Sequence, residues 1–200
     1  MIAIIDYGAG NIGSVEKAFR AIGCECVTTG DRDTILSADK VVLPGVGAFG
    51  DAMGKLKDSG LDEVIKTVFS RKTPLFGICL GLQLLFEGSD EAPGVKGLSI
   101  LPGYVHKFPT DKGFKVPQIG WNNLKTKEGS KLFKGLQSDP YVYFVHSYYL
   151  LTEDKYVSAK CDYITEFHAA VEHDNVFACQ FHPEKSGDTG LQILKNFAFM

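Results

Sequence analysis

The chain has 200 residues, of which 44% are hydrophobic and 22% are charged, and its formal net charge at pH 7 is −3. This length predicts one domain over residues 1–200, because no shift in composition divides the chain. A slightly acidic chain gives no reason to expect a nucleic acid or an anionic membrane as partner. The apolar start, residues 1–5, is too short for a signal peptide or a membrane span. Five scattered cysteines indicate free thiols and a reducing, cytoplasmic location.

A glycine-rich loop follows the first predicted strand, residues 2–5, and leads into a helix that opens near Ser14. The loop contains three glycines with the spacing of the dinucleotide-binding fingerprint, Gly8, Gly10 and Gly13. The acidic residue of that fingerprint would be Asp31, just after the next predicted strand, 24–28. The chain is short for a dehydrogenase, and we find no second domain for a hydride acceptor. We therefore interpret the loop as a βα connection at the carboxyl edge of a parallel sheet, with NAD or FAD binding as the alternative.

A second glycine-rich turn, residues 44–50, follows a predicted strand at 40–43. Successive backbone N–H groups in such a turn can point into one concavity and bind an anion. Acyl transfer needs donors of this kind beside the nucleophile, to hold the oxyanion of the tetrahedral intermediate. The alternative is a plain βα turn. A helical stretch at about 51–70, broken at Gly60, comes next, and this alternation of strand and helix predicts a parallel sheet covered on both faces.

A strand–turn–helix pattern surrounds Cys79. The apolar run after Pro74 predicts a buried parallel strand, and the leucine-rich segment after the cysteine has helical spacing. Gly77 and Gly81 lie two residues to either side, where a Cβ would clash in a sharp turn. This is the layout of a nucleophile elbow with Cys in place of Ser, and a helix N-terminus favours the thiolate. The alternative is a buried, inert cysteine.

Beyond Gly88 the sequence predicts mostly antiparallel strands. After a loop at 91–97, we expect two strands, at 98–108 and 114–124, joined by a polar turn at 110–113. A short helix is predicted at 131–136, and then strands at 141–151, 156–162, 166–173 and 176–181. A helix carrying the apolar residues of 191–199 follows. The pattern predicts an α/β sheet with an antiparallel insertion, in which the last strand returns at an edge.

His182 is the candidate for the base that a cysteine nucleophile needs. It follows an apolar strand directly, as Cys79 does. Glu184, two residues on, can reach the imidazole, fix its tautomer and stabilise the imidazolium. We interpret the other histidines considered as surface residues: His106, His168 and His173. No HExxH motif or paired-cysteine spacing is present, so no metal is expected.

Together these motifs resemble the class I (triad) glutamine amidotransferases. The segments that carry the resemblance are the elbow 77–83, the loop 44–47 and the run His182-Pro183-Glu184. Four further segments are similar to the glutaminase subunits of imidazole glycerol phosphate synthases, from histidine biosynthesis: 6–11, 91–97, 120–122 and 144–148. The resemblance implies a flavodoxin-like fold, with a mainly parallel central sheet flanked by helices and an additional antiparallel strand region in the C-terminal half. It also implies that the first glycine loop binds no dinucleotide and faces the partner.

The resemblance implies a role for each site residue. Cys79 would attack the amide carbon of L-glutamine, His182 would protonate the departing ammonia and then activate water, and Glu184 would hold His182. The oxyanion would be held by backbone N–H groups of Val46, Gly47 and Leu80. The glutamine head group would be seated by Gln83, Glu91, His146, Ser147 and Tyr148. Without the family, an exposed helix position would be an equally good interpretation of Gln83.

The resemblance also implies a partner. Ammonia would pass by a protected path to a (β/α)8-barrel cyclase subunit of a heterodimer, which makes imidazole glycerol phosphate and an aminoimidazole carboxamide ribotide. The positions expected at this interface are Asn11, Trp121, Tyr143 and Lys185; the two aromatic residues would otherwise be core residues. No cofactor is implied. The glycines of the loop 44–47 would let an oxyanion donor point away until partner and ligand bind.

Three other functions stay open on the sequence alone. One is another triad glutaminase subunit, such as that of a pyridoxal phosphate synthase, and a second is a stand-alone glutamyl hydrolase, which would need no partner. The third is a non-catalytic module that binds a nucleotide at the glycine loop. The intact set of Cys79, His182 and Glu184 argues against the module.

Overall fold

The computed structural model describes residues 1–8, 12–110 and 113–200. The elements of the first half are β1 (Ile2–Ile5), α1 (Ile12–Ala21), β2 (Cys26–Thr29), α2 (Arg32–Ser37), β3 (Lys40–Gly45), α3 (Phe49–Asp58), α4 (Leu61–Ser70), β4 (Leu75–Cys79) and α5 (Leu80–Leu84). Those of the second half are β5 (Tyr104–Lys107), β6 (Gln118–Asn123), β7 (Lys125–Thr126), β8 (Tyr141–His146), β9 (Tyr148–Leu151), β10 (Val157–Asp162), β11 (Glu166–His173), β12 (Val176–Cys179), the 3₁₀ turn η1 (Pro183–Lys185) and α6 (Gly187–Phe199).

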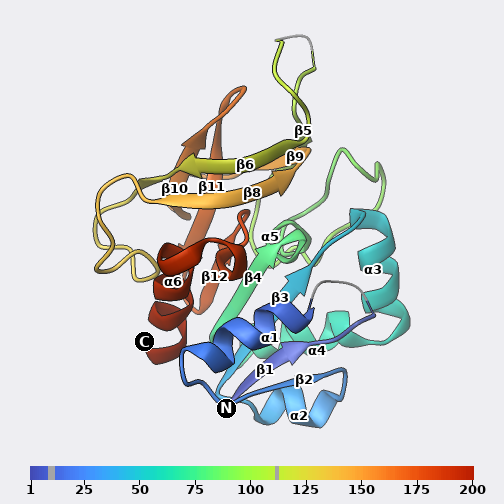
Figure 1. The fold of residues 1–200 in the computed structure, drawn as a ribbon. Helices are drawn as coiled ribbons and strands as arrows, with labels where there is room; N and C mark the ends of the chain where they lie inside the picture. Colours follow the sequence, from blue (N-terminus) through green and yellow to red (C-terminus); the bar gives the residue numbers. More distant parts are fainter. Residues whose placement is uncertain (9–11, 111–112) are drawn as a thin grey trace.

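An eight-stranded sheet with the order β2-β1-β3-β4-β12-β11-β10-β7 forms the centre of the molecule (Figure 1). The first five strands of this order pair in parallel, and the pairs from β12 to β7 are antiparallel. Successive residues of a strand point to opposite faces. Ala3 and Ile5 accordingly share a core with α3 and α4, while Ile2 and Ile4 share another with α1 and α6. Helices therefore cover both faces, as the alternating pattern predicted.

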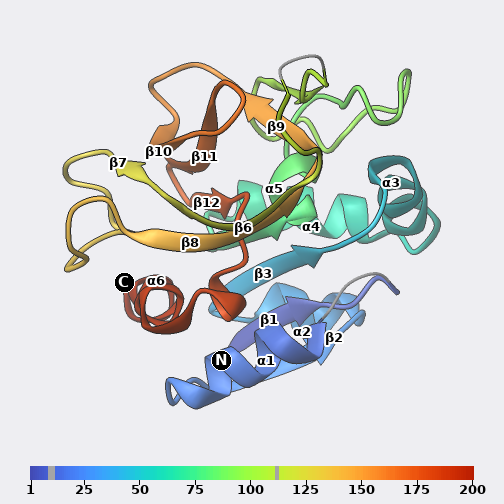
Figure 2. The same cartoon turned by 45° about the horizontal axis from the view of Figure 1, so that its top comes forward.

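Two short ribbons complete the fold. β5 pairs with β9, and β6 pairs with β8, both antiparallel and both outside the main sheet. Figure 1 shows β6 and β8 lying above α5 and the upper end of β4, and in Figure 2 they curve together over β12. The β6–β8 ribbon consequently covers the carboxyl ends of the parallel strands.

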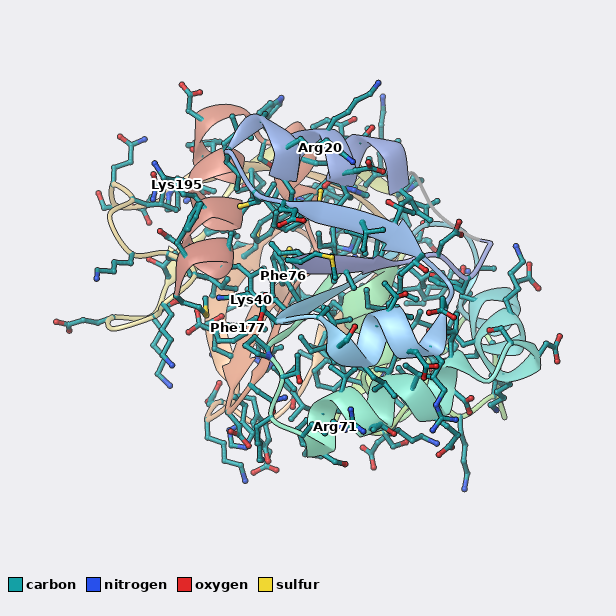
Figure 3. The ribbon with its side chains drawn as sticks, turned by 90° about the horizontal axis from the view of Figure 1, so that it is seen from below. Arg20, Lys40, Arg71, Phe76, Phe177 and Lys195 are labelled. Atoms are coloured by element: carbon teal, nitrogen blue, oxygen red, sulfur yellow. The ribbon has the colours of Figure 1, made fainter. Side chains whose placement is uncertain are left out.

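At the amino ends of the parallel strands, the sheet is covered by apolar packing. The rings of Phe76 and Phe177 lie 5.0 Å and 5.9 Å from that of Phe197 in α6. Lys40 donates from Nζ to the Phe197 carbonyl over 2.9 Å, and Figure 3 shows Lys40 beside the two strand phenylalanines. This packing leaves the carboxyl ends of the strands as the place for a site, where ligands bind in open α/β sheets.

Two predicted elements of the second half differ from the structure. The strands expected at 98–108 and 114–124 are shorter and do not pair with each other, because Ser99 (φ 52°) and Gly103 (φ 140°) bend the chain before Tyr104. The turn expected between them lies partly outside the described residues. The helix expected at 131–136 is a series of turns, in which the backbone N–H groups of Lys131 and Leu132 donate to the Glu172 carboxylate and Gly135 has φ 78°.

The last strand is also placed differently from the prediction. β12 lies at the centre of the sheet, between β4 and β11, and not at an edge. β3 continues through Pro44 to Gly45, so the second glycine-rich turn begins only at Val46. Within the part of the chain that the structure describes, no helix has the length and apolar character needed to cross a membrane.

Candidate active site

The strand–turn–helix geometry predicted around Cys79 is confirmed. β4 ends at Cys79 and α5 begins at Leu80, and the cysteine has φ 55° and ψ −110°, outside the usual regions for a residue with a side chain. A Cβ on Gly81 would lie 1.9 Å from the Leu43 carbonyl oxygen, and one on Gly77 would lie 2.9 Å from the Gly81 oxygen. The glycines therefore provide space for a close approach of backbone, and the strained conformation falls on the cysteine itself.

Parallel pairing of β12 with β4 brings His182 next to Cys79. Cys179 of β12 lies opposite Ile78 of β4, so the segments that follow these two strands leave the sheet at the same level. Glu184 then lies beside the imidazole, with Oε1 2.8 Å from His182 Nδ1, and the two side chains are only 5% and 2% exposed. The sequence-predicted cysteine, histidine and glutamate are thus brought together.

The charge state of His182 follows from this environment. Burial alone would lower the pKa of His182. Hydrogen bonds to Cys79 and Glu184, with the negative charges of both, outweigh burial and raise the pKa to about 10. The imidazolium is therefore the favoured form at neutral pH, and it lies between a carboxylate and the sulfur.

The backbone of His182 is fixed to β8 by Ser186, which the sequence analysis did not single out. Ser186 Oγ donates to the His182 carbonyl over 2.7 Å and accepts from the Tyr143 N–H over 2.9 Å. The His182 N–H donates to the Tyr143 carbonyl over 2.9 Å. A Cβ on Gly190 would lie 1.9 Å from the Pro183 oxygen, so α6 packs directly against the His-Pro-Glu turn. The base is held from two sides.

A cavity of about 320 Å³ lies next to these residues. Cys79, His182 and all three predicted oxyanion donors line it: Val46, Gly47 and Leu80. The predicted glutamine-binding residues line it as well: Gln83, Glu91, His146, Ser147 and Tyr148. Segments from four distant parts of the sequence therefore meet around one space of the size of a small amino acid and its solvent.

Gln83 is buried, at 5% exposure, so its interpretation as an exposed helix position is wrong. Its Nε2 donates to Gln180 Oε1 over 2.9 Å and to the Tyr148 carbonyl over 3.4 Å. Gln180 is fully buried and donates from Nε2 to Cys79 Sγ over 3.7 Å. The sequence analysis missed Gln180, although a polar residue in an apolar run directly before His182 was an available signal.

The far wall of the cavity is held by polar contacts. Glu91 Oε2 accepts from the Phe49 N–H at the start of α3 over 2.8 Å. His146 has Nδ1 2.8 Å from the Tyr148 carbonyl and Nε2 2.9 Å from the Gln118 side-chain amide. Burial lowers the pKa of His146 to about 4. The atom that faces Nε2 is Gln118 Oε1, an acceptor like the Tyr148 carbonyl, so a neutral ring can donate to only one of these two oxygens.

The predicted interface residues have different surroundings. Trp121 is 56% exposed on β6, with its ring 6.0 Å from that of the half-buried Tyr143 on β8, so its interpretation as a core aromatic is wrong. Ile119, on the same face of β6, is also exposed. Lys185 is exposed and lines the cavity. Asn11 lies outside the described residues.

Other sequence candidates have structural roles. Asp31 caps α2 by accepting the Thr34 N–H over 2.9 Å, which gives the acidic residue of the dinucleotide fingerprint another function. His168 is buried and accepts the Thr152 N–H, so its interpretation as a surface residue is wrong, whereas His173 is exposed. Within the described ranges, no group of three or more His, Cys, Asp or Glu residues is arranged to hold a metal ion.

Comparisons with known proteins give the same family as the motifs. The family model "Glutamine amidotransferase class-I" matches residues 3–200. The chain is 51% identical, over 98% of its length and 97% of the relative, to imidazole glycerol phosphate synthase subunit HisH of Methanothermobacter thermautotrophicus. It is 49% identical, over 100% and 98%, to the HisH subunit of Caldanaerobacter subterraneus subsp. tengcongensis.

Solved structures support the fold independently. PurLQS from Thermotoga maritima superposes with a TM-score of 0.77 at 18% identity, over 98% of this chain and 96% of that one. The glutaminase domain of Trypanosoma brucei CTPS has a TM-score of 0.68 at 18% identity, over 98% and 93%. The chain belongs to the class-I glutamine amidotransferase family and, within it, to the imidazole glycerol phosphate synthase HisH subunits.

Proposed function

We propose that this chain, as a single amidotransferase domain over residues 1–200, is the glutaminase subunit of an imidazole glycerol phosphate synthase in histidine biosynthesis. It hydrolyses L-glutamine to glutamate and ammonia. The observation that carries the proposal is the placement of Cys79 and His182 at one wall of a cavity of about 320 Å³, with Glu184 hydrogen-bonded to His182 behind that wall. Its five free thiols support a reducing, cytoplasmic location.

The reaction follows the triad logic of a nucleophile, a base and an orienting carboxylate. Cys79 Sγ forms a bond to the side-chain carbonyl carbon of glutamine, and the imidazolium of His182 gives its proton to the nitrogen that leaves as ammonia. The neutral imidazole then takes a proton from water, whose oxygen attacks the glutamyl thioester. Glutamate leaves, and sulfur and imidazolium are restored. Glu184 keeps Nδ1 of His182 oriented throughout, over the 2.8 Å hydrogen bond.

The oxyanion of each tetrahedral intermediate needs donors on the side away from His182. The Leu80 N–H is one candidate, because Leu80 is the first residue of α5 and lines the cavity. The backbone of Val46 and Gly47 supplies the second. One such donor is worth about 3 kcal/mol in the transition state. Gly47 has φ 100°, a conformation that favours glycine, and a Cβ there would meet no described atom within 4 Å.

The polar groups around the cavity suit the head group of glutamine. Glu91 and the side-chain oxygen of Gln83 offer acceptors for the α-ammonium group, and the exposed ammonium of Lys185 can face the α-carboxylate. The backbone of Ser147 and Tyr148 completes this wall. We assign the glutamine-binding role to these residues and to the His146 backbone.

The partner that we propose is a (β/α)8-barrel cyclase subunit, which receives the ammonia by a protected path. The face of the β6–β8 ribbon that carries Ile119, Trp121 and Tyr143 supports a docking role, because it exposes apolar and aromatic side chains. It adjoins the site, since Tyr143 holds the backbone of His182. Docking there can act on the base directly, and Asn11 and Lys185 are assigned to the same interface.

Ammonia release from glutamine tests the proposal, measured for the chain alone and with a barrel cyclase subunit plus its ribotide ligand. We expect little activity alone, a large rise in the complex and none with Cys79→Ala. Full activity without a partner would identify a stand-alone hydrolase. No activity with this cyclase, but activity with a pyridoxal phosphate synthase partner, would overturn the assignment within the family.

A further inference from the structure

We propose that Gln180 is a positioning residue that sets the amide orientation of Gln83 and holds the sulfur of Cys79, an inference that rests on the glutaminase function proposed above. Gln180 lies between β12 and His182 and is fully buried. It does not line the cavity, so it acts on substrate only through the two residues it contacts.

The contacts form a chain from the nucleophile to the cavity wall. Gln180 Nε2 is 3.7 Å from Cys79 Sγ, and Gln180 Oε1 accepts from Gln83 Nε2 over 2.9 Å. The Gln180 backbone N–H donates to the Ala169 carbonyl over 2.8 Å, which fixes the residue to β11. Both polar ends of the Gln180 side chain are therefore used, and neither reaches solvent.

The direction of this chain follows from hydrogen-bond chemistry. A thiolate only accepts, so the NH₂ end of the Gln180 amide must face Sγ and its oxygen must face Gln83. Gln83 then uses its NH₂ on the Gln180 oxygen and on the Tyr148 carbonyl, 3.4 Å away. Its own oxygen is left for the cavity. The site consequently presents an acceptor there, which suits the α-ammonium group of the bound amino acid.

The same contact affects the nucleophile. A donor beside the sulfur stabilises the thiolate relative to the thiol, and a hydrogen bond to a charged group is worth more than one between neutral groups. Because Gln180 is fully buried, its replacement removes this donor from the sulfur and leaves the Gln83 NH₂ group without its Gln180 acceptor. Substrate orientation and thiolate formation thus depend on one buried amide.

The test uses neutral variants, Gln180→Met and Gln83→Met, and follows alkylation of Cys79 by iodoacetamide against pH, read by mass spectrometry of the Cys79 peptide. For Gln180→Met we expect the alkylation midpoint to rise by about one pH unit. In the complex with the cyclase, kcat should fall about tenfold or more and KM for glutamine should rise several-fold.

A double-mutant cycle then tests the relay. Gln83→Met removes the donor that fixes the Gln180 oxygen, so it should raise the alkylation midpoint in the wild-type background and leave it unchanged in the Gln180→Met background. If Gln180→Met does not fold, the shift in Gln83→Met alone still decides. An unchanged midpoint in Gln83→Met overturns the relay.

Asn175→Leu is the matched control. Asn175 is a buried amide that directly precedes β12, and its Nδ2 donates to the Phe69 and Thr73 carbonyls at the opposite edge of the sheet. We expect Asn175→Leu to lower stability without moving the alkylation midpoint or KM. If Gln180→Met, like Asn175→Leu, lowers stability and changes neither the alkylation midpoint nor KM, Gln180 has a purely structural role and the proposal is wrong. If Gln180→Met shifts the alkylation midpoint but the wild-type complex releases no ammonia from glutamine, the proposed function is wrong and the relay is still supported.

Discussion

The two sides of the cavity are held in different ways. On the triad side, His182 and Glu184 are nearly fully buried, and the base is fixed through both its side chain and its backbone. On the oxyanion side, Val46 is 38% exposed and Gly47 meets no described atom where a Cβ would be. The comparison indicates that the triad is assembled in the free chain, whereas the loop of Val46 and Gly47, which we propose to hold the oxyanion, is less enclosed. We therefore expect control by a partner to act on this loop as well as on the base.

The largest effect should come from the fixed side. We expect Glu184→Gln to lower kcat in the cyclase complex by about 10³–10⁴-fold with little change in KM, because the imidazolium loses its orienting charge. The pKa of His182, raised to about 10, should fall toward its ordinary value and can be followed by NMR. A decrease in kcat of less than tenfold would show that the Glu184 carboxylate does not take part in catalysis.

The elbow glycine should be nearly irreplaceable for stability. Gly81→Ala places a Cβ 1.9 Å from the Leu43 carbonyl oxygen, and we expect it to lower the free energy of unfolding by at least about 3 kcal/mol. The matched control is Gly54→Ala in α3, where a Cβ meets no described atom within 4 Å and should stabilise the chain by about 0.5–1 kcal/mol. Denaturant unfolding of both variants compares them. Equal stabilities would contradict the proposed crowding.

Replacing the loop glycine, Gly47, should affect activity more than stability. Gly47→Ala has space but must adopt φ near 100°, which costs about 1–2 kcal/mol of stability. Because the peptide of Val46 and Gly47 can no longer turn freely, partner-stimulated ammonia release should fall about 10–100-fold, while the activity of the free chain changes little. Full stimulation of this variant would remove the loop from the control mechanism.

The pH dependence of stability should also be measurable, and the two cavity histidines should differ in sign. The pKa of His182 is raised to about 10, so its contribution is complete below about pH 6.5 and is lost as the pH rises toward 10. The pKa of His146 is lowered to about 4, so stability is lost as the pH falls from about 6.5 toward 4. Replacing each histidine by Asn should flatten only its own limb of the unfolding free energy against pH. If the unfolding free energy of a variant depends on pH as it does in the wild type, the pKa shift given for the replaced histidine is wrong.

Much of the parallel half could be predicted from the sequence. Apolar runs bounded by glycine located β1, β3 and β4 to within a few residues, because buried parallel strands carry their signal locally. The partners of β5, β6 and β12 could not be predicted in this way. Alternating patterns show that a strand has two faces and do not say which strand lies beside it.

The site divides along the same line. Cys79, His182 and Glu184 stand in local motifs that their chemistry requires, so sequence reasoning found them. Gln180 and Ser186 act through contacts with residues 101 and 43 positions away in the chain. No local spacing reports such contacts. The pairing of β12 with β4 brings Gln180 to Cys79, and the turn after His182 brings Ser186 to Tyr143 on β8.

The central position of β12 has a consequence for synthesis of the chain. The ribosome makes β4 and its cysteine early, but the partner strand that carries the histidine is among the last segments to emerge. Until that strand pairs with β4, the thiol has no neighbouring base. Unfinished or truncated chains therefore cannot release ammonia, and the completed sheet itself is the signal that activity can begin.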